Sequence, residues 1–220
     1  NSLVSVSVGA SFNQSSFQSN TSGTNSVAGN IEVGKNFIIQ SERDVKLVNQ
    51  KVSVGENFVV DAKNFEALAG ENTKKNDTKS SSMGINASYN PLGNSVSGGV
   101  NLSGSNSNSS SKTYDNTVIS VGGTFQLTTK EDATFKGANV TADKVNFDIG
   151  RDLNVISLQD ESKTDGQHYG VSVNAGAKFG KDSEGNTKYV KGSTFPTFGG
   201  SYGENHQDGQ WVGNQTSIVA

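Results

Sequence analysis

Short stretches of alternating apolar and polar residues run through this chain. Phe125-Gln126-Leu127 and Ala133-Thr134-Phe135 each read apolar, polar, apolar, and residues 145–149 continue the pattern. Successive side chains of a β-strand point to opposite faces, so this alternation predicts strands that bury one face. No stretch of the sequence carries apolar residues at helical spacing. The chain is therefore predicted to be all-β.

The strand signals recur every 20 or 21 residues. Gly34-Lys35-Asn36-Phe37 returns as Gly55-Glu56-Asn57-Phe58, and Phe125 is followed at the same phase by Val145. A short fixed period is typical of a solenoid, in which each coil places its apolar side chains above those of the coil before. We expect a right-handed parallel β-helix (β-solenoid) with coils about 4.8 Å apart. Its predicted structural core comprises Phe37, Ile39, Leu47, Phe58, Val60, Leu68, Phe125, Leu127, Phe135, Val145, Phe147, Leu153 and Val155.

Charged tripeptides separate the predicted strands. Residues 42–44, 130–132 and 150–152 read Glu-Arg-Asp, Lys-Glu-Asp and Gly-Arg-Asp. The Asp at each corner is expected to accept hydrogen bonds from nearby backbone N–H groups and so tighten the turn. The only arginines, Arg43 and Arg151, fall at equivalent corners, which favours a structural over a catalytic role.

A different pattern follows each block of coils. Residues 84–102 read as two strands joined by a turn at residues 90–94, and residues 168–202 repeat this plan around a loop at residues 180–186. We expect hairpins that project from the coils or lie beside them. Tyr169, Val171, Val173 and Phe179 share one face of the second hairpin. Their pattern and length fit either contact with a membrane or packing against the flank of the coils.

Two diverged modules align at a separation of about 88 residues. The segment Val33-Gly34-Lys35-Asn36-Phe37 corresponds to residues 121–125 in order and spacing. The expected organisation is the tail of a preceding module (1–27), a first module of coils and hairpin (28–115), a second such module (116–205) and the start of a further one (206–220). The stretch Val4 to Phe12 reads as the second arm of a hairpin, so we expect the chain to be a piece of a longer one.

The composition supports a thin structure. Hydrophobic residues make up 31% of the chain, against roughly 45–50% in ordinary globular domains, which suits strands that bury one face only. The net charge of -3 and the 11 Phe residues argue against disorder. Mild acidity argues against nucleic acid as a partner. Because there is no Cys, disulfides cannot contribute to stability.

Candidate chemistry is sparse. Asp132, Asp152 and Asp160 lack the spacing of a calcium loop, and His168 and His206 stand alone, without the further ligands that zinc requires. No nucleophile elbow or phosphate-binding loop is present in the sequence. We therefore expect no catalytic residue, no cofactor and no metal site, and a protein that is not an enzyme.

Three blocks of the second module resemble a known family. They are I-G-R-D-L-N-V (Ile149 to Val155), S-L-Q-D-E-S-K (Ser157 to Lys163) and H-Y-G-V-S-V-N-A-G (His168 to Gly176). Their order and spacing resemble the haemagglutinin repeats of filamentous-haemagglutinin-like exoproteins of two-partner secretion systems, including contact-dependent growth inhibition effectors. The first module departs from the pattern at residues 68–73.

The resemblance implies a secreted protein displayed on the surface of a Gram-negative bacterium. It implies export through the outer-membrane transporter of the two-partner system. Two roles follow from it: filament structure with delivery of a C-terminal toxin across a target-cell outer membrane, or an adhesin shaft that attaches to host or bacterial surfaces. The expected partners are therefore a target-cell outer membrane or a receptor.

Overall fold

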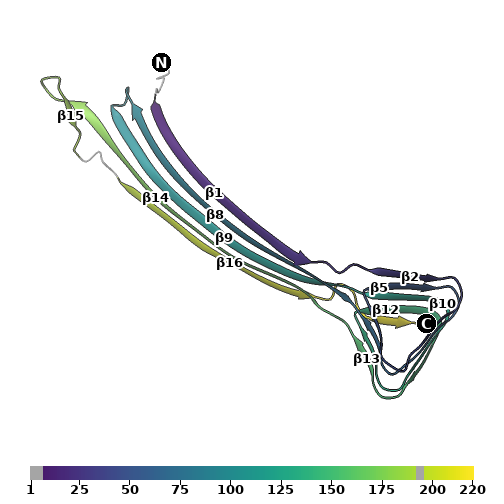
Figure 1. The fold of residues 1–220 in the computed structure, drawn as a ribbon. Coiled ribbons are helices and arrows are strands. Elements are labelled where there is room, and N and C mark those ends of the chain that lie inside the picture. Colours follow the sequence, from purple (N-terminus) through teal and green to yellow (C-terminus); the bar gives the residue numbers. More distant parts are fainter. Residues whose placement is uncertain (1–6, 192–195) are drawn as a thin grey trace. The chain divides into compact units, whose positions relative to one another are not determined.

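The chain is all-β in the computed structural model, which describes residues 7–191 and 196–220 (Figure 1). Its residues fall into two compact units, each discontinuous in sequence. The first unit holds residues up to Thr21, Asn76–Ser109 and Thr164–Gln207, and the second holds Ser22–Lys75, Ser110–Lys163 and Asp208–Ala220. This division cuts across the repeat modules expected from the sequence. Residues 4–6 of the expected N-terminal hairpin arm lie outside the described residues.

In the second unit the chain winds in successive turns, and the strands of neighbouring turns pair in parallel. Figure 1 shows β2, β5, β10 and β12 lying side by side. The larger parallel sheet contains β2 (Gly29–Val33), β5 (Gln50–Val54), β10 (Thr117–Thr129), β12 (Ala138–Ile149) and β17 (Ser217–Val219), joined by β3 (Phe37–Gln40) and β6 (Phe58–Ala62). The smaller one contains β4 (Val45–Val48), β7 (Phe65–Leu68), β11 (Ala133–Lys136) and β13 (Leu153–Ile156).

The register of these strands follows the spacing of the sequence. Phe125 pairs with Val145 and Leu127 pairs with Phe147 across β10 and β12. Phe37 pairs with Phe58 across β3 and β6. The predicted steps of 20 and 21 residues are thus confirmed at these pairs. Equivalent side chains of successive turns lie directly above one another.

The inward side chains form one continuous hydrophobic cluster within the second unit. Every buried or half-buried member of this cluster lies on the parallel strands. Of the expected core residues, the cluster buries Leu47, Phe58, Val60, Phe125, Leu127 and Phe135. Its half-buried margin includes Phe37, Ile39, Val145 and Phe147.

Three expected core residues lie outside the cluster. Leu47 pairs with Ala67 rather than with Leu68, and Ala67 is fully buried while Leu68 is only half-buried. Because alternate residues of a strand face opposite ways, the shift of one position turns Leu68 away from the cluster. Leu153 and Val155 pair with the predicted partners on β11. They are each 48% exposed, however, on β13, which is one of the two outer strands of its sheet.

The turns between strands lie where the charged tripeptides predict them. Residues 42–44, 130–132 and 150–152 separate strands of the second unit. Asp132 accepts a hydrogen bond from the backbone N–H of Asp152 at 3.2 Å. Its carboxylate also accepts two from the Arg151 guanidinium, at 2.9 and 2.7 Å. These bonds tie one turn to the next rather than tightening the turn of Asp132 itself. Asp44 at the equivalent corner accepts from the side chain of Asn64 at 2.8 Å.

Long strands are inserted between the parallel turns (Figure 1). One pair leaves after β7 and the chain returns at β10, and further strands leave after β13 and the chain returns at β17. Together with the N-terminal strand they form a separate sheet in the order β1-β8-β9-β14-β15, with β16 also paired to β14. Its strands are β1 (Val8–Thr24), β8 (Gly70–Asn90), β9 (Ser95–Asp115), β14 (Asp160–Lys181), β15 (Thr187–Tyr189) and β16 (Thr197–Trp211).

These strands are much longer than the alternation predicts. The predicted hairpin at residues 84–102 extends back to Gly70 and on to Asp115. The added parts are rich in Ser, Asn, Thr and Lys. Cross-strand hydroxyl pairs support them, with Ser80 and Ser105 joined at 2.7 Å. The strands therefore continue through polar sequence because pairing, rather than burial, stabilises them.

Candidate functional site

The long sheet of the first unit has two chemically different faces. An added Cβ at Gly104 would lie 2.6 Å from the Tyr169 ring, so Tyr169 covers this glycine from the next strand. Even-numbered residues of β9 and odd-numbered residues of β14 therefore share one face, because side chains alternate along a strand. The hydroxyls of Ser82 and Ser103, 2.7 Å apart, place even residues of β8 and odd residues of β9 on the other face.

The same reasoning extends to the outer strands. The hydroxyls of Ser16 and Ser81 lie 2.8 Å apart, which places even residues of β1 on the face of Tyr169. An added Cβ at Gly203 would lie 2.1 Å from the His168 ring, so odd residues of β16 share the face of His168. Even residues of β16 therefore lie on the face of Tyr169. That face carries a continuous set of apolar side chains, which we call the apolar patch. The large members of the apolar patch are Val8, Phe12, Met83, Ile85, Tyr89, Val96, Val100, Leu102, Tyr169, Val171, Val173, Phe179, Phe198 and Tyr202.

The apolar patch is open to solvent. Val171 is 53% exposed, Leu102 is 45% exposed and Phe198 is 77% exposed. The hydrophobic cluster of buried residues includes no member of the first unit. The opposite face carries mostly Ser, Asn and Gly, with hydroxyl pairs such as Ser88 and Ser97 at 2.7 Å, and Phe17 is an exposed aromatic residue on it. The sheet of the first unit is thus amphipathic across its thickness.

Aromatic side chains mark the ends of the apolar patch. Tyr169 and Tyr202 lie where polar residues succeed the apolar ones along β14 and β16. At the other end, the rings of Phe179 and Tyr189 meet edge to face, with centroids 6.4 Å apart. Tyr202 donates a hydrogen bond to the carboxylate of Glu204, which raises the pKa of the phenol.

A hydrogen bond between the His206 ring and the Asp165 carboxylate lies beyond the apolar patch on the same face. His168, the other histidine, lies on the opposite face against Gly203. The two histidines therefore belong to different faces of the sheet. Neither the described histidines nor the described carboxylates gather into a group of three or more that could hold a metal ion. Asp160 instead accepts the backbone N–H of Tyr114 at 2.9 Å.

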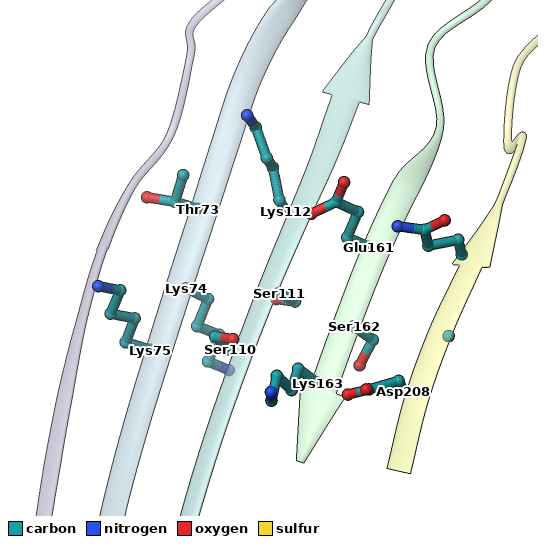
Figure 2. A pocket seen from close by; sticks show the side chains of 12 residues that line it. Thr73, Lys74, Lys75, Ser110, Ser111, Lys112, Glu161, Ser162, Lys163 and Asp208 are labelled. Atoms are coloured by element: carbon teal, nitrogen blue, oxygen red, sulfur yellow. The ribbon is translucent and has the colours of Figure 1, made fainter. Parts of the chain in front are cut away.

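The long strands continue into the second unit, and their residues there line an open groove of about 620 Å³. Figure 2 shows its lining residues on four neighbouring strands, β8, β9, β14 and β16. Lysines and small hydroxyl residues predominate, and two carboxylates accompany them. The lining consists of Thr73, Lys74, Lys75, Ser110, Ser111, Lys112, Glu161, Ser162, Lys163, Asp208, Gly209 and Gln210.

Lys112 contacts both an acidic and an aromatic side chain of its own chain. Its ammonium group forms an ion pair with Glu71 at 3.0 Å and lies 5.4 Å from the centroid of the Tyr114 ring. Hydrogen bonding with Tyr114, and then with Glu71, raises the pKa of Lys112 above its usual range. Lys112 is therefore a cation already bound to an anion of its own chain. Glu161 and Asp208 add further negative charge to the groove, which thus has mixed rather than uniformly positive charge.

The sequence identified part of these surfaces. Tyr169, Val171 and Val173 are exposed on β14, and Phe179 is half-buried against β15. The members of the apolar patch on the other strands were not predicted. The alternation from Met83 to Tyr89 carried the signal for them. The groove was also missed, since no motif marks lysines that come together from three separate strands.

Within residues 7–191 and 196–220, the structure contains no helix with the length and apolar character needed to cross a membrane.

Comparison with known proteins places the chain among repeat sequences. A family model described as hemagglutinin repeat matches residues 10–175. The chain is 28% identical over 170 residues to a toxin CdiA of Escherichia coli, covering 73% of the chain and 5% of that protein. It is 31% identical over 191 residues to a tRNA nuclease CdiA of E. coli strain 536, covering 82% and 6%. A tRNA nuclease CdiA of Yersinia mollaretii is 30% identical over 199 residues, covering 86% and 7%.

The chain thus spans only 5–7% of the length of these relatives. No solved structure matches the chain.

Proposed function

Because the chain belongs to the hemagglutinin-repeat family, we propose that it is a non-catalytic repeat segment of a large secreted exoprotein on the surface of a Gram-negative bacterium. In this proposal the segment builds a filament and serves the delivery of a C-terminal toxin across the outer membrane of a target cell. Export uses the outer-membrane transporter of a two-partner system. The relatives are named as toxins and nucleases, and the chain matches only 5–7% of the length of each. This small share supports a role for the segment outside their toxic activity.

The observation that carries the structural part of this proposal is the pairing of successive turns. Phe37, Phe58 and Phe125 occupy equivalent positions on three parallel strands. We propose that these turns form a right-handed parallel β-helix, which grows by adding turns and so suits a filament. A crystal structure in which the turns wind left-handed would overturn the assignment.

An adhesin shaft is the second candidate, because the family model takes its description from haemagglutination. The two functions differ in what removal of the segment does to a cell. Residues 28–205 would be deleted in frame from the full-length exoprotein. Surface display, attachment to target cells and growth of those cells would then be measured. Delivery requires that display and attachment persist while toxicity toward the target is lost.

The shaft predicts the other result: attachment falls in step with the deletion. Toxicity that stays at the level of the intact protein contradicts a delivery role. A matched control deletes an equal number of residues from another repeat region of the same exoprotein. This control separates loss of this segment from simple shortening of the filament.

A further inference from the structure

Asn106, on β9, has a buried side-chain oxygen that accepts no hydrogen bond from the described residues of the chain. Buried polar atoms nearly always have a hydrogen-bond partner, because an unpaired one costs roughly 1–3 kcal/mol. Asn106 also lines three open hollows of the first unit, of about 400, 340 and 360 Å³. Since Oδ1 makes no bond, rotation of the amide turns this oxygen toward a ligand without breaking one there.

The ring of Tyr169 forms one wall of the hollow of about 360 Å³, which we call the Asn106 hollow. The ring covers Gly104, because an added Cβ at this glycine would lie 2.6 Å from it. Tyr169 is nevertheless 55% exposed, so an aromatic surface faces outward. The side chains that share this hollow include three amides and one ammonium group, from Gln18, Asn106, Gln167 and Lys79.

These four side chains converge because the strands alternate in step. Ser16 and Ser81 meet through their hydroxyls on the face of Tyr169. Gln18 and Lys79 each lie two residues from that pair, so their side chains point to the same face. Asn106 and Gln167 follow Gly104 and Tyr169 in the same way. The Asn106 hollow therefore combines an aromatic wall with polar groups from β1, β8, β9 and β14.

The charge around Asn106 weighs against a polyanion as the ligand. Lys79 is the cation of the Asn106 hollow. The two adjoining hollows, however, are lined by the carboxylates of Asp77, Asp165 and Glu204. A strongly anionic chain would be repelled by these carboxylates as it extends beyond the Asn106 hollow.

The position of Asn106 within the sheet weighs against an extended peptide. A peptide that adds as a strand requires an open sheet edge. β9 has β8 on one side and β14 on the other, so its backbone is already paired. A ligand of the Asn106 hollow must therefore be recognised by side chains alone.

We propose that the Asn106 hollow binds one unit of a neutral saccharide. The π face of Tyr169 is electron-rich and attracts the C–H groups on the face of a sugar ring. The hydroxyl groups at the rim of the ring both donate and accept hydrogen bonds, which matches the amides of Asn106 and Gln167. The adjoining hollows share Asn106 and extend the site to neighbouring units of an oligosaccharide. This inference goes beyond the proposed function and holds for either of its two roles.

Saturation-transfer NMR of the unaltered chain with neutral hexasaccharides tests the proposal. The probes are maltohexaose, cellohexaose, mannohexaose and chitohexaose. At least one of them is expected to bind with a Kd in the micromolar to millimolar range. Heparin, a polyanion, is expected not to displace it. Absence of binding by all four neutral sugars, or displacement by heparin, overturns the proposal.

Two variants locate the site. Asn106→Ala and Tyr169→Leu are each expected to weaken binding of the hexasaccharide at least tenfold. The matched controls are Asn101→Ala, on the opposite face of β9, and Tyr89→Leu, on the same face but outside the three hollows. Both controls are expected to bind as the unaltered chain does. Equal losses in variants and controls would contradict the assignment.

Thermal unfolding separates a ligand-binding Asn106 from a structural one. Asn106→Ala removes an unpaired buried oxygen and is expected to leave Tm unchanged or to raise it. A fall in Tm together with the loss of binding would show that Asn106 supports the fold instead. Phosphatidylethanolamine vesicles without sugar provide the last arm. Binding to these vesicles by a chain that binds no free hexasaccharide assigns recognition to the apolar patch and overturns the saccharide site.

Discussion

The ring of Phe125 lies flat over the ring of Phe58, with centroids 5.0 Å apart and planes 9° from parallel. Both side chains are fully buried. They are paired residues of β10 and β6, although the whole of β8 and β9 separates them in sequence. The chain therefore leaves the parallel stack, forms a long hairpin and returns in register.

Removal of the Phe125 ring tests this stacking. Phe125→Ala is expected to lower the free energy of unfolding by roughly 3–5 kcal/mol, because the lost ring leaves a cavity between turns. Urea denaturation followed by circular dichroism measures the change. The control Gln126→Ala alters the next residue of the same strand, which is exposed, and is expected to change stability by less than about 0.5 kcal/mol. Similar losses for the two variants would contradict the inward position of Phe125.

Sequence spacing predicts the stacking only while the connections keep their length. The turn between β3 and β4 spans residues 41–44, whereas that between β6 and β7 spans residues 63 and 64. Phe37 and Phe58 are 21 residues apart, but Val45 and Phe65 are only 20 apart. A constant step therefore selects Leu68 where the structure buries Ala67. The return from Phe58 to Phe125 could not be predicted either, because the hairpin between them has no fixed period.

The amphipathic sheet shows a different limit of sequence reasoning. Alternation predicts the strand around Val171 because its face is apolar. It gives no signal for the polar part of β8, where Ser80 pairs with Ser105 through hydroxyl groups. Those residues are extended because a partner strand runs alongside them. The groove that includes Lys112 likewise depends on which strands become neighbours. Local sequence patterns do not predict this strand order.

An asparagine ladder at one corner provides a second test. Asn57 donates to Asn36 at 2.9 Å, and its side-chain oxygen accepts the backbone N–H of Thr124 at 3.1 Å. Asn57→Ala is expected to cost about 1–2 kcal/mol, because it removes both bonds and leaves the N–H of Thr124 without its acceptor. Thermal unfolding measures the loss. Asn146→Ala, at an exposed position of β12, is the control and is expected to be nearly neutral.

A column of glycines at another corner depends on close backbone approach. An added Cβ at Gly122 would lie 2.4 Å from the carbonyl oxygen of Gly55, whereas one at Gly34 would meet nothing within 4 Å. Gly122→Ala therefore forces neighbouring turns apart and is expected to cost roughly 1–3 kcal/mol. Gly34→Ala occupies the equivalent position of an outer turn and is expected to leave the urea midpoint almost unchanged. Equal tolerance of both substitutions would show that the turns are not packed this closely.

The ion pair of Asp132 and Arg151 predicts a dependence of stability on pH. Hydrogen bonds from the Arg151 guanidinium, helped by the backbone N–H of Asp152, lower the pKa of the Asp132 carboxyl in the folded chain. In the unfolded chain this pKa is near the usual value of about 3.9. A carboxyl with a depressed folded pKa stabilises the fold fully above the unfolded value. Its contribution is lost as the pH falls through the lower folded value.

Asp132→Asn is therefore expected to lower Tm at pH 7 and to have progressively less effect below about pH 4. Calorimetry of the unaltered chain and the variant between pH 7 and pH 2 measures how the gap in Tm closes. Asp148→Asn, which removes an exposed carboxylate from β12, controls for the change in net charge and is expected to show no comparable gap. If Asp132→Asn lowers Tm equally at pH 7 and pH 2, the charge of Asp132 contributes nothing to the link between successive turns. The loss of stability then comes from the geometry of the turn.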